Sequence, residues 1–139
     1  MQRTGRCLCG AVSYTAEVHE TITACHCGMC RRWTGGPLLS VGTHRIDWTG
    51  EPHITTFTSS GWAERGFCST CGSCLFYRVT IEGRFQGFTS LPMGTLDDQT
   101  GMTMTKEYFS DKRPGGYHFS GDRKQITEAE VMALLASLH

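Results

Sequence analysis

The sequence lacks a long apolar run, an excess of charge of either sign, an internal repeat and a linker. No stretch approaches the length needed to span a bilayer, and the first residues contain no apolar run of signal-peptide length. Lysine and arginine number 13, as do aspartate and glutamate, so the formal net charge is zero. A neutral chain without a basic block is a poor partner for nucleic acid or for an anionic membrane. We therefore expect a cytoplasmic protein that binds neither.

The length and composition fit one globular domain over residues 1–139. A chain of 139 residues can bury one hydrophobic core. Hydrophobic residues make up 39% and charged residues 19%, which argues against disorder. The 17 glycines allow many tight turns and therefore favour short strands joined by loops.

Alternation of apolar and polar residues predicts two strands, over residues 12–18 and 75–81. In the second, Phe76 interrupts the polar face, so both sides of that strand are expected to be covered. Weaker patterns predict further strands over residues 38–41, 54–58, 84–89 and 117–120. The fold is therefore expected to be mainly β.

A short helix is predicted at the C-terminus. Thr127 and Glu130 have the spacing of a capping box. The apolar residues that follow at i, i+3, i+4 and i+7 are Val131, Leu134, Leu135 and Leu138. This single apolar stripe is typical of an amphipathic helix, which we expect to dock on the core.

Eight cysteines fall into three close clusters. The clusters are Cys7 and Cys9; Cys25, Cys27 and Cys30; and Cys68, Cys71 and Cys74. In a reducing cytosol such spacing predicts metal binding before disulfides. Eight reduced and buried cysteines are the competing interpretation, but structural cysteines need no such spacing.

Two of the cysteine pairs suit a closed structural zinc site. In an extended Cys7-x-Cys9 both sulfurs point the same way. The pair Cys68 and Cys71, followed by Gly72, has the spacing of a zinc knuckle. Neither pair fills a zinc alone, and two pairs together would make a four-cysteine site. Spacing by itself leaves other pairings open.

The middle cluster suits an open zinc site. A turn after Cys25 and Cys27 can bring Cys30 to the same ion, and three protein ligands leave the fourth position free. That pattern is typical of catalytic zinc. A fourth protein ligand would make the site structural instead. His26 should point to the opposite face of the segment and is expected to pack rather than to bind the ion.

Three further residues near these clusters have open roles. Arg31 and Arg32 follow the triplet and could balance its charge or hold an anionic substrate, or could simply be solvated. Cys74 is expected to be a core residue at the start of a strand. A third sulfur for the knuckle pair and a redox thiol are the alternatives for Cys74.

Three sequence blocks, residues 5–12, 25–32 and 65–72, resemble the signature blocks of the glutathione-dependent formaldehyde-activating enzyme family. This family shares its domain with centromere protein V. A weaker fourth match covers residues 106–112, followed by Pro114 and Tyr117. The resemblance spans roughly residues 3–120, with the order and the spacing of the blocks intact.

The resemblance implies a single zinc-stapled domain over residues 1–139, a β-tent of antiparallel sheets. It implies a structural zinc held by Cys7, Cys9, Cys68 and Cys71. It also implies a second zinc held by Cys25, Cys27 and Cys30, with glutathione bound nearby. Gly28 stands where the family often has serine, and Cys74 where it usually has a small residue other than cysteine.

The function that the resemblance implies is that of a carbon–sulfur lyase. Such an enzyme forms or cleaves S-hydroxymethylglutathione, the adduct of a thiol, glutathione, with an aldehyde, formaldehyde. The triplet would be catalytic, and Arg31, Arg32 or Arg65 could pair with the carboxylates of glutathione. The alternatives are a zinc domain that binds a thiol without turning it over, a structural interaction module, and a sulfoxide-reducing enzyme that uses Cys74.

Overall fold

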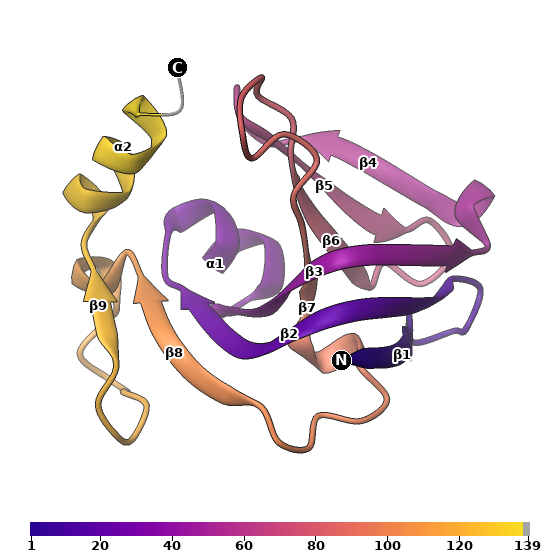
Figure 1. The fold of residues 1–139 in the computed structure, drawn as a ribbon, viewed down its shortest axis with the longest axis horizontal. Helices are drawn as coiled ribbons and strands as arrows, with labels where there is room; N and C mark the ends of the chain where they lie inside the picture. Colours follow the sequence, from indigo (N-terminus) through magenta and orange to yellow (C-terminus); the bar gives the residue numbers. More distant parts are fainter. Residues whose placement is uncertain (138–139) are drawn as a thin grey trace.

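The structure, a computed structural model, describes residues 1–137 and is mainly β with a short C-terminal helix, as the sequence predicts (Figure 1). Its strands are β1 (Gln2–Arg6), β2 (Ser13–Cys25), β3 (Leu38–Thr49), β4 (Ile54–Thr58), β5 (Ala63–Cys68), β6 (Cys74–Val79), β7 (Thr89–Pro92), β8 (Thr103–Tyr108) and β9 (Lys124–Ile126). Its helices are α1 (Gly28–Thr34) and α2 (Glu128–Ala136), with 3-10 turns η1 (Glu51–His53), η2 (Met93–Thr95) and η3 (Ser110–Lys112).

The strands form one open sheet in the order β4-β5-β6-β7-β3-β2-β8-β9, with β1 paired to β2. Most pairs are antiparallel, but β2 with β8 and β8 with β9 are parallel. The expected mainly β, mostly antiparallel architecture is therefore confirmed, as one continuous sheet with two parallel pairs. Parallel neighbours need long connections, and both β8 and β9 are reached through loops that carry a 3-10 turn.

Strand β2 pairs with three other strands of the sheet. It pairs with β3 over most of its length, with β1 in its first half and with β8 in its second half. Its predicted alternation is confirmed, because Val12, Tyr14, Ala16 and Val18 are all buried. The pairing with β3 shifts register between Val18 and Ile22, and such irregularities bend a strand. The bend curves the sheet around its core.

The main core lies inside this curved sheet and consists of side chains from β2, β3, β6 and β7 together with two cysteines, Val12 and Leu96. Its buried members are Cys7, Val12, Tyr14, Ala16, Val18, Ile22, Val41, Cys68, Leu75, Phe76, Leu91 and Leu96. Phe76 is 1% exposed, which confirms that both faces of β6 are covered. The core therefore surrounds one of the predicted cysteine groups.

Two of the weaker strand predictions are wrong. Residues 84–88 form turns and only Thr89 begins β7, because Gly83 and Gly87 both take positive φ angles and reverse the chain. Residues 117–120 form a loop, since β8 pairs with β9 rather than with this segment. The remaining predicted strands lie within β2, β3, β4 and β6, apart from residue 12, which precedes β2, and residues 80–81, which follow the end of β6.

Helix α2 begins with the predicted capping box, in which Thr127 Oγ1 accepts from the Glu130 amide at 3.3 Å. The expected docking on the core is wrong. Leu134 is 52% exposed, while Val131 and Leu135 are only half-buried. The helix follows β9 at the edge of the sheet, away from the main core (Figure 1). Leu138 lies outside the described residues.

Within residues 1–137, no helix is both long enough and apolar enough to span a bilayer.

The close packing of β5 on β6 gives the first prediction. A Cβ atom added at Gly66 would lie 2.2 Å from Cε2 of the buried Phe76 ring. We expect Gly66→Ala to lower the free energy of unfolding by about 1–3 kcal/mol, as overpacked cores do. Gly61→Ala is the control, because a Cβ there meets nothing within 4 Å. Urea unfolding of both variants measures the two free energies of unfolding. Equal values for Gly66→Ala and Gly61→Ala would contradict the close contact between Gly66 and Phe76.

Candidate metal centres and active site

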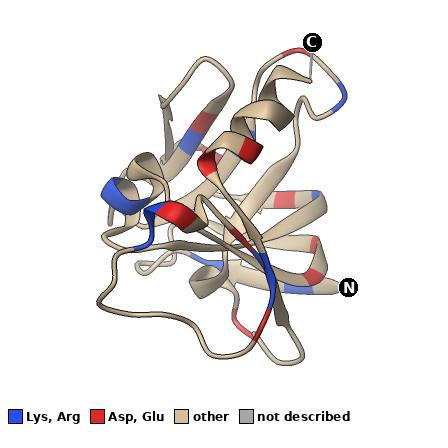
Figure 2. Cartoon of the chain, turned by 90° about the vertical axis from the view of Figure 1, so that its left-hand side faces the viewer, with Lys and Arg blue, Asp and Glu red and all other residues tan. Residues whose placement is uncertain are grey.

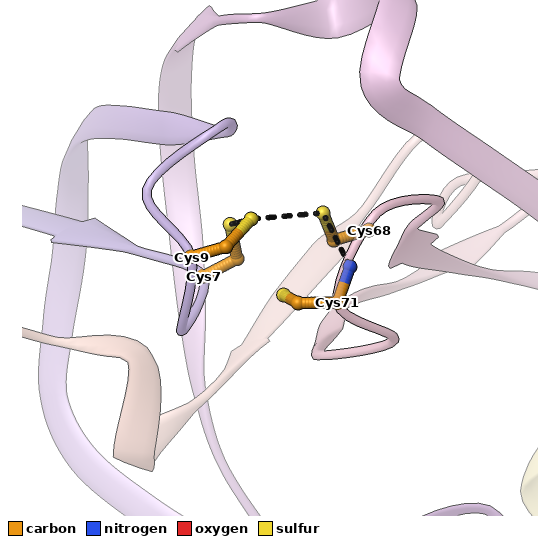
Figure 3. A group of neighbouring side chains, drawn as sticks. All are labelled: Cys7, Cys9, Cys68 and Cys71. Atoms are coloured by element: carbon orange, nitrogen blue, oxygen red, sulfur yellow. Dashed lines mark hydrogen bonds between the residues drawn. The ribbon is translucent and has the colours of Figure 1, made fainter.

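Four cysteine sulfurs meet where two loops approach each other (Figure 3). Cys7 and Cys9 lie in the loop between β1 and β2, and Cys68 and Cys71 lie at the turn between β5 and β6. The Sγ atoms of Cys7 and Cys9 are 3.6 Å apart, and those of Cys9 and Cys68 are 3.8 Å apart. We call this group the quartet. The structure thus brings together the two pairs that the sequence singled out.

Both loops of the quartet close in the same way. The Gly10 amide donates to the Cys7 carbonyl at 3.2 Å, and the Gly72 amide donates to the Cys68 carbonyl at 2.8 Å. Both glycines have φ near +80°, which a residue with a side chain rarely adopts. The glycine after each pair is therefore needed to turn the chain and to leave both sulfurs on one side.

The quartet has the dimensions of a tetrahedral thiolate site. Four sulfurs bound at about 2.3 Å to a central zinc ion would lie about 3.8 Å from one another. The observed separations match that spacing, and all four sulfurs lie within 4.8 Å of one another. The quartet could therefore hold a metal ion with no position left open.

Ser73 supports the quartet and was not singled out by the sequence. Its Oγ lies 3.2 Å from Cys71 Sγ and accepts from the Leu8 amide at 3.0 Å, so that it links the two loops. The hydrogen bond from Ser73 is the main reason that the pKa of Cys71 falls to about 5. A lowered pKa favours the thiolate, which is the form that binds metal.

The second group consists of Cys25, Cys27 and Cys30, whose sulfurs also lie within 4.8 Å of one another. We call it the triplet. Cys25 ends β2, and Cys27 caps α1, where its Sγ accepts from the Cys30 amide at 3.3 Å. Hydrogen bonds from Cys25 and Cys30 hold the pKa of Cys27 well below its usual value. The triplet could hold a second metal ion with one position free.

Arg65 from β5 lies against the triplet. Both of its terminal nitrogens are 3.6 Å from Cys30 Sγ, and the side chain is buried. The guanidinium lies over the rings of Trp33 and Tyr77, at 5.0 and 5.1 Å from their centroids. Three thiolates and a divalent ion carry one net negative charge, so Arg65 balances the loaded triplet. This geometry assigns the balancing role to Arg65 rather than to Arg31 or Arg32.

A buried carboxylate holds the segment between the first two triplet cysteines. Glu107 on β8 is fully buried and accepts from His26 Nε2 and Gln125 at 2.8 Å, from Arg123 at 2.8 Å and from Arg113 at 2.9 Å. Burial raises the pKa of Glu107, but these hydrogen bonds outweigh it and bring the pKa down to about 2. Glu107 is therefore ionised at neutral pH.

His26 faces this carboxylate and not the sulfurs. The metal-binding group consists of its two neighbours and Cys30, without the imidazole. His26 Nδ1 lies 3.4 Å from the hydroxyl of Tyr117, so both ring nitrogens have partners other than sulfur. The expected packing role of His26 agrees with this arrangement. The Glu107 contact was not foreseen, because the two residues are 81 positions apart.

A cavity of about 450 Å³ opens beside the triplet. All three triplet cysteines line it, and none of the quartet cysteines does. Most of its wall is apolar or aromatic, with Leu38, Trp62, Tyr77, Val79, Phe88 and Phe109 among the lining residues. A small molecule in this cavity would contact the cysteines of the triplet.

Three residues suggested by the sequence lie outside this cavity. Arg31 and Arg32 are exposed on α1 and are not among its lining residues. Cys74 is half-buried on β6, where its Sγ donates to the Trp33 carbonyl at 3.7 Å. It belongs neither to the main core nor to the sulfur groups, and burial raises the pKa of its thiol. A higher pKa lowers the reactivity expected of a redox thiol.

Comparison with known proteins finds relatives that match most of the chain. A family model described as "Glutathione-dependent formaldehyde-activating enzyme" matches residues 2–112. A protein of Schizosaccharomyces pombe named as an uncharacterized lyase is 28% identical over 130 residues. That alignment covers 92% of this chain and 93% of the relative.

The two sulfur groups are predicted to respond differently to loss of a cysteine. Cys68→Ser should leave the quartet incomplete and largely unfold the protein, because two loops at the core lose their link. Cys27→Ser should lose the metal of the triplet and keep the fold. Circular dichroism and metal content by mass spectrometry measure both effects. A folded Cys68→Ser protein, or equal unfolding of the two variants, would contradict these roles.

Glu107 is predicted to stabilise the fold through its buried ion pairs. Glu107→Gln should lower the free energy of unfolding at pH 7 by about 3 kcal/mol, because Arg123 stays buried without a counter-charge. The lowered pKa means that this stabilisation is complete above about pH 4.5 and is lost as the pH falls toward 2. The difference in the free energy of unfolding between the wild type and Glu107→Gln should therefore decrease as the pH falls.

Urea unfolding at several pH values measures this effect. Acid also weakens thiolate-bound metal in both proteins alike, so the two are compared down to the lowest pH at which both remain folded, and the difference between them isolates Glu107. Glu64→Gln is the matched control, because its salt bridge to Arg78 is partly exposed and should contribute less than about 1 kcal/mol. If Glu107→Gln and Glu64→Gln lower the free energy of unfolding equally, the buried network of Glu107 contributes no more than a partly exposed salt bridge.

Proposed function

This chain belongs to the glutathione-dependent formaldehyde-activating enzyme family, and we propose that it is a zinc-dependent carbon–sulfur lyase. The proposed reaction forms or cleaves an adduct of a thiol and an aldehyde, such as S-hydroxymethylglutathione. One observation carries the proposal: the cavity reaches the three sulfurs of the triplet and none of the quartet. Only the triplet therefore offers a metal position to a substrate.

We assign zinc to both groups on their chemistry. All ligands are thiolates, and the spacing of the quartet suits tetrahedral coordination. The quartet is then a closed structural site, and the triplet is an open catalytic site. When bound at the triplet, zinc supplies a Lewis acid that keeps an incoming thiol ionised. Free cysteines suit a reducing compartment, and we propose the cytoplasm.

The proposed step is an addition without oxidation or reduction. The thiol sulfur forms a bond to the aldehyde carbon, and the π electrons of the carbonyl move to its oxygen. That oxygen takes up one proton, and the thiol has given up one, so atoms and charge balance. The reverse step breaks the carbon–sulfur bond and returns the thiol and the aldehyde.

Side chains around the triplet have defined tasks in this step. Arg65 offsets the negative charge of the three thiolates through its contact with Cys30. Burial raises the pKa of Tyr77 to about 12 despite the nearby guanidinium, so its phenol remains protonated at neutral pH. From the cavity wall this hydroxyl could donate a hydrogen bond to the substrate oxygen as charge develops there. Arg31 and Arg32, exposed on α1, are the proposed partners of the carboxylates of glutathione.

Exchange spectroscopy tests the proposal. The zinc-loaded protein should accelerate exchange between glutathione and S-hydroxymethylglutathione in formaldehyde, measured by NMR. Cys27→Ser should abolish the acceleration, because it removes one of the three sulfurs. Cys74→Ser is the matched control and should retain it, since its sulfur lies in neither group.

The uncatalysed addition is fast, so the comparison among the three proteins decides the outcome. Acceleration that survives Cys27→Ser would place the chemistry elsewhere. No acceleration by protein with zinc confirmed at the triplet would leave a thiol-binding role without turnover.

A further inference from the structure

We propose that the cavity beside the triplet binds an apolar substituent of the thiol–aldehyde adduct, about the size of a phenyl ring or a short alkyl chain. The substrate would then be larger and more apolar than S-hydroxymethylglutathione. This inference rests on the proposed function and names the substrate class of the same site.

The size and lining of the cavity support an apolar occupant. Formaldehyde contributes one carbon and one oxygen, whereas the cavity measures about 450 Å³ and lies within the range of sites for whole small molecules. Trp62, Val79, Phe88 and Leu38 line it beside the sulfurs. Polar substrates leave such a wall without partners, and apolar groups gain free energy by burial against it.

The backbone of Phe109 gives a second reason. Within residues 1–137 it is the one residue other than glycine with a positive φ angle, at 55°. Such a conformation costs free energy and persists where the surroundings require it. Here it accompanies an aromatic ring in the cavity wall, packed against the group formed by Cys27, Cys30 and Leu38.

The charges around the cavity do not suit the whole of glutathione. Glutathione has two carboxylates and one ammonium group. Among the described residues that line the cavity there is no aspartate or glutamate, and Arg65 is already in contact with Cys30. Burial and the neighbouring His44 lower the pKa of His19, which favours its neutral form. The charged ends of a glutathione adduct would therefore lie outside the cavity. Over the chain as a whole, charged residues of both signs are dispersed rather than gathered by sign (Figure 2).

Helix α2 completes the apolar wall. Val131 and Leu135 line the cavity, while Leu134 points away and is 52% exposed. None of these residues belongs to the main core. The apolar side of α2 is thus explained by the cavity, and the helix provides variants that do not touch the metal ligands.

Binding of stable thioethers tests the proposal without turnover. S-methyl-, S-butyl- and S-benzylglutathione share one peptide and differ in the group on sulfur. Titration calorimetry with the zinc-loaded protein should show S-benzylglutathione binding at least about tenfold more tightly than S-methylglutathione. Equal affinities across the series would overturn the inference.

Matched variants on α2 locate the binding site. Leu135→Asp should reduce the affinity ratio of the benzyl to the methyl thioether below about threefold, because a carboxylate enters the wall. Leu134→Asp is the control and should keep the ratio of the wild type. Circular dichroism confirms that both variants are folded. A ratio unchanged by Leu135→Asp would overturn the assignment to this cavity.

NMR exchange then shows which reactant carries the apolar group. One arm pairs glutathione with hexanal, and the other pairs phenylmethanethiol with formaldehyde; in both, S–H adds across C=O without any redox partner. Acceleration in the first arm places the group on the aldehyde, and acceleration in the second places it on the thiol. Acceleration confined to glutathione with formaldehyde, and absent from both of these arms, would overturn the inference and keep the proposed function. No acceleration in any arm would overturn both.

Discussion

The link between the β1–β2 loop and the β5–β6 turn is the constraint on which the rest of the structure depends. Three strands, β6, β7 and β3, lie between β5 and β2 in the sheet. Cys9 and Cys68 nevertheless bring their sulfurs to 3.8 Å, so the sheet must curl until its distant parts meet. Cys7 and Cys68 lie within the hydrophobic core, and the metal-binding group and the core therefore form together. A small sheet with one short helix at its edge gains its closure from these four side chains.

The curled sheet also builds the second site. Strand β5 contributes Cys68 to the quartet and Arg65 to the triplet, and β2 begins near the first group and ends on Cys25. From the other side, Glu107 on β8 fixes His26 between two triplet cysteines. The three sulfurs are thus held by strands from both halves of the sheet and by the first turn of α1. Such support keeps reactive groups in place without metal ligands beyond the three cysteines.

Local spacing predicts part of this arrangement and cannot predict the rest. Alternation identifies β2, because its buried side chains follow the period of a strand, and the capping box identifies the start of α2. Cysteine spacing distinguishes two pairs from a triplet, but only the family resemblance predicts that the two pairs form one site. Periodicity predicts which face of a helix or strand is apolar, but it does not predict which other part of the chain packs against that face. The contacts of Arg65 with Cys30 and of His26 with Glu107 join residues far apart in the chain. For the same reason the predicted docking of α2 on the core is wrong, and Val131 and Leu135 line the cavity instead.

The position of Arg65 on β5 has a consequence for assembly. The guanidinium reaches Cys30 only when β5 has been brought across the sheet, which the quartet enforces. Before that closure, the triplet would gather negative charge without its counter-ion. The two sites are therefore expected to load in sequence, with the closed site first and the open site second. If both groups bind metal, a shortage of metal would leave the quartet loaded and the triplet empty, so that the fold would persist without the second site.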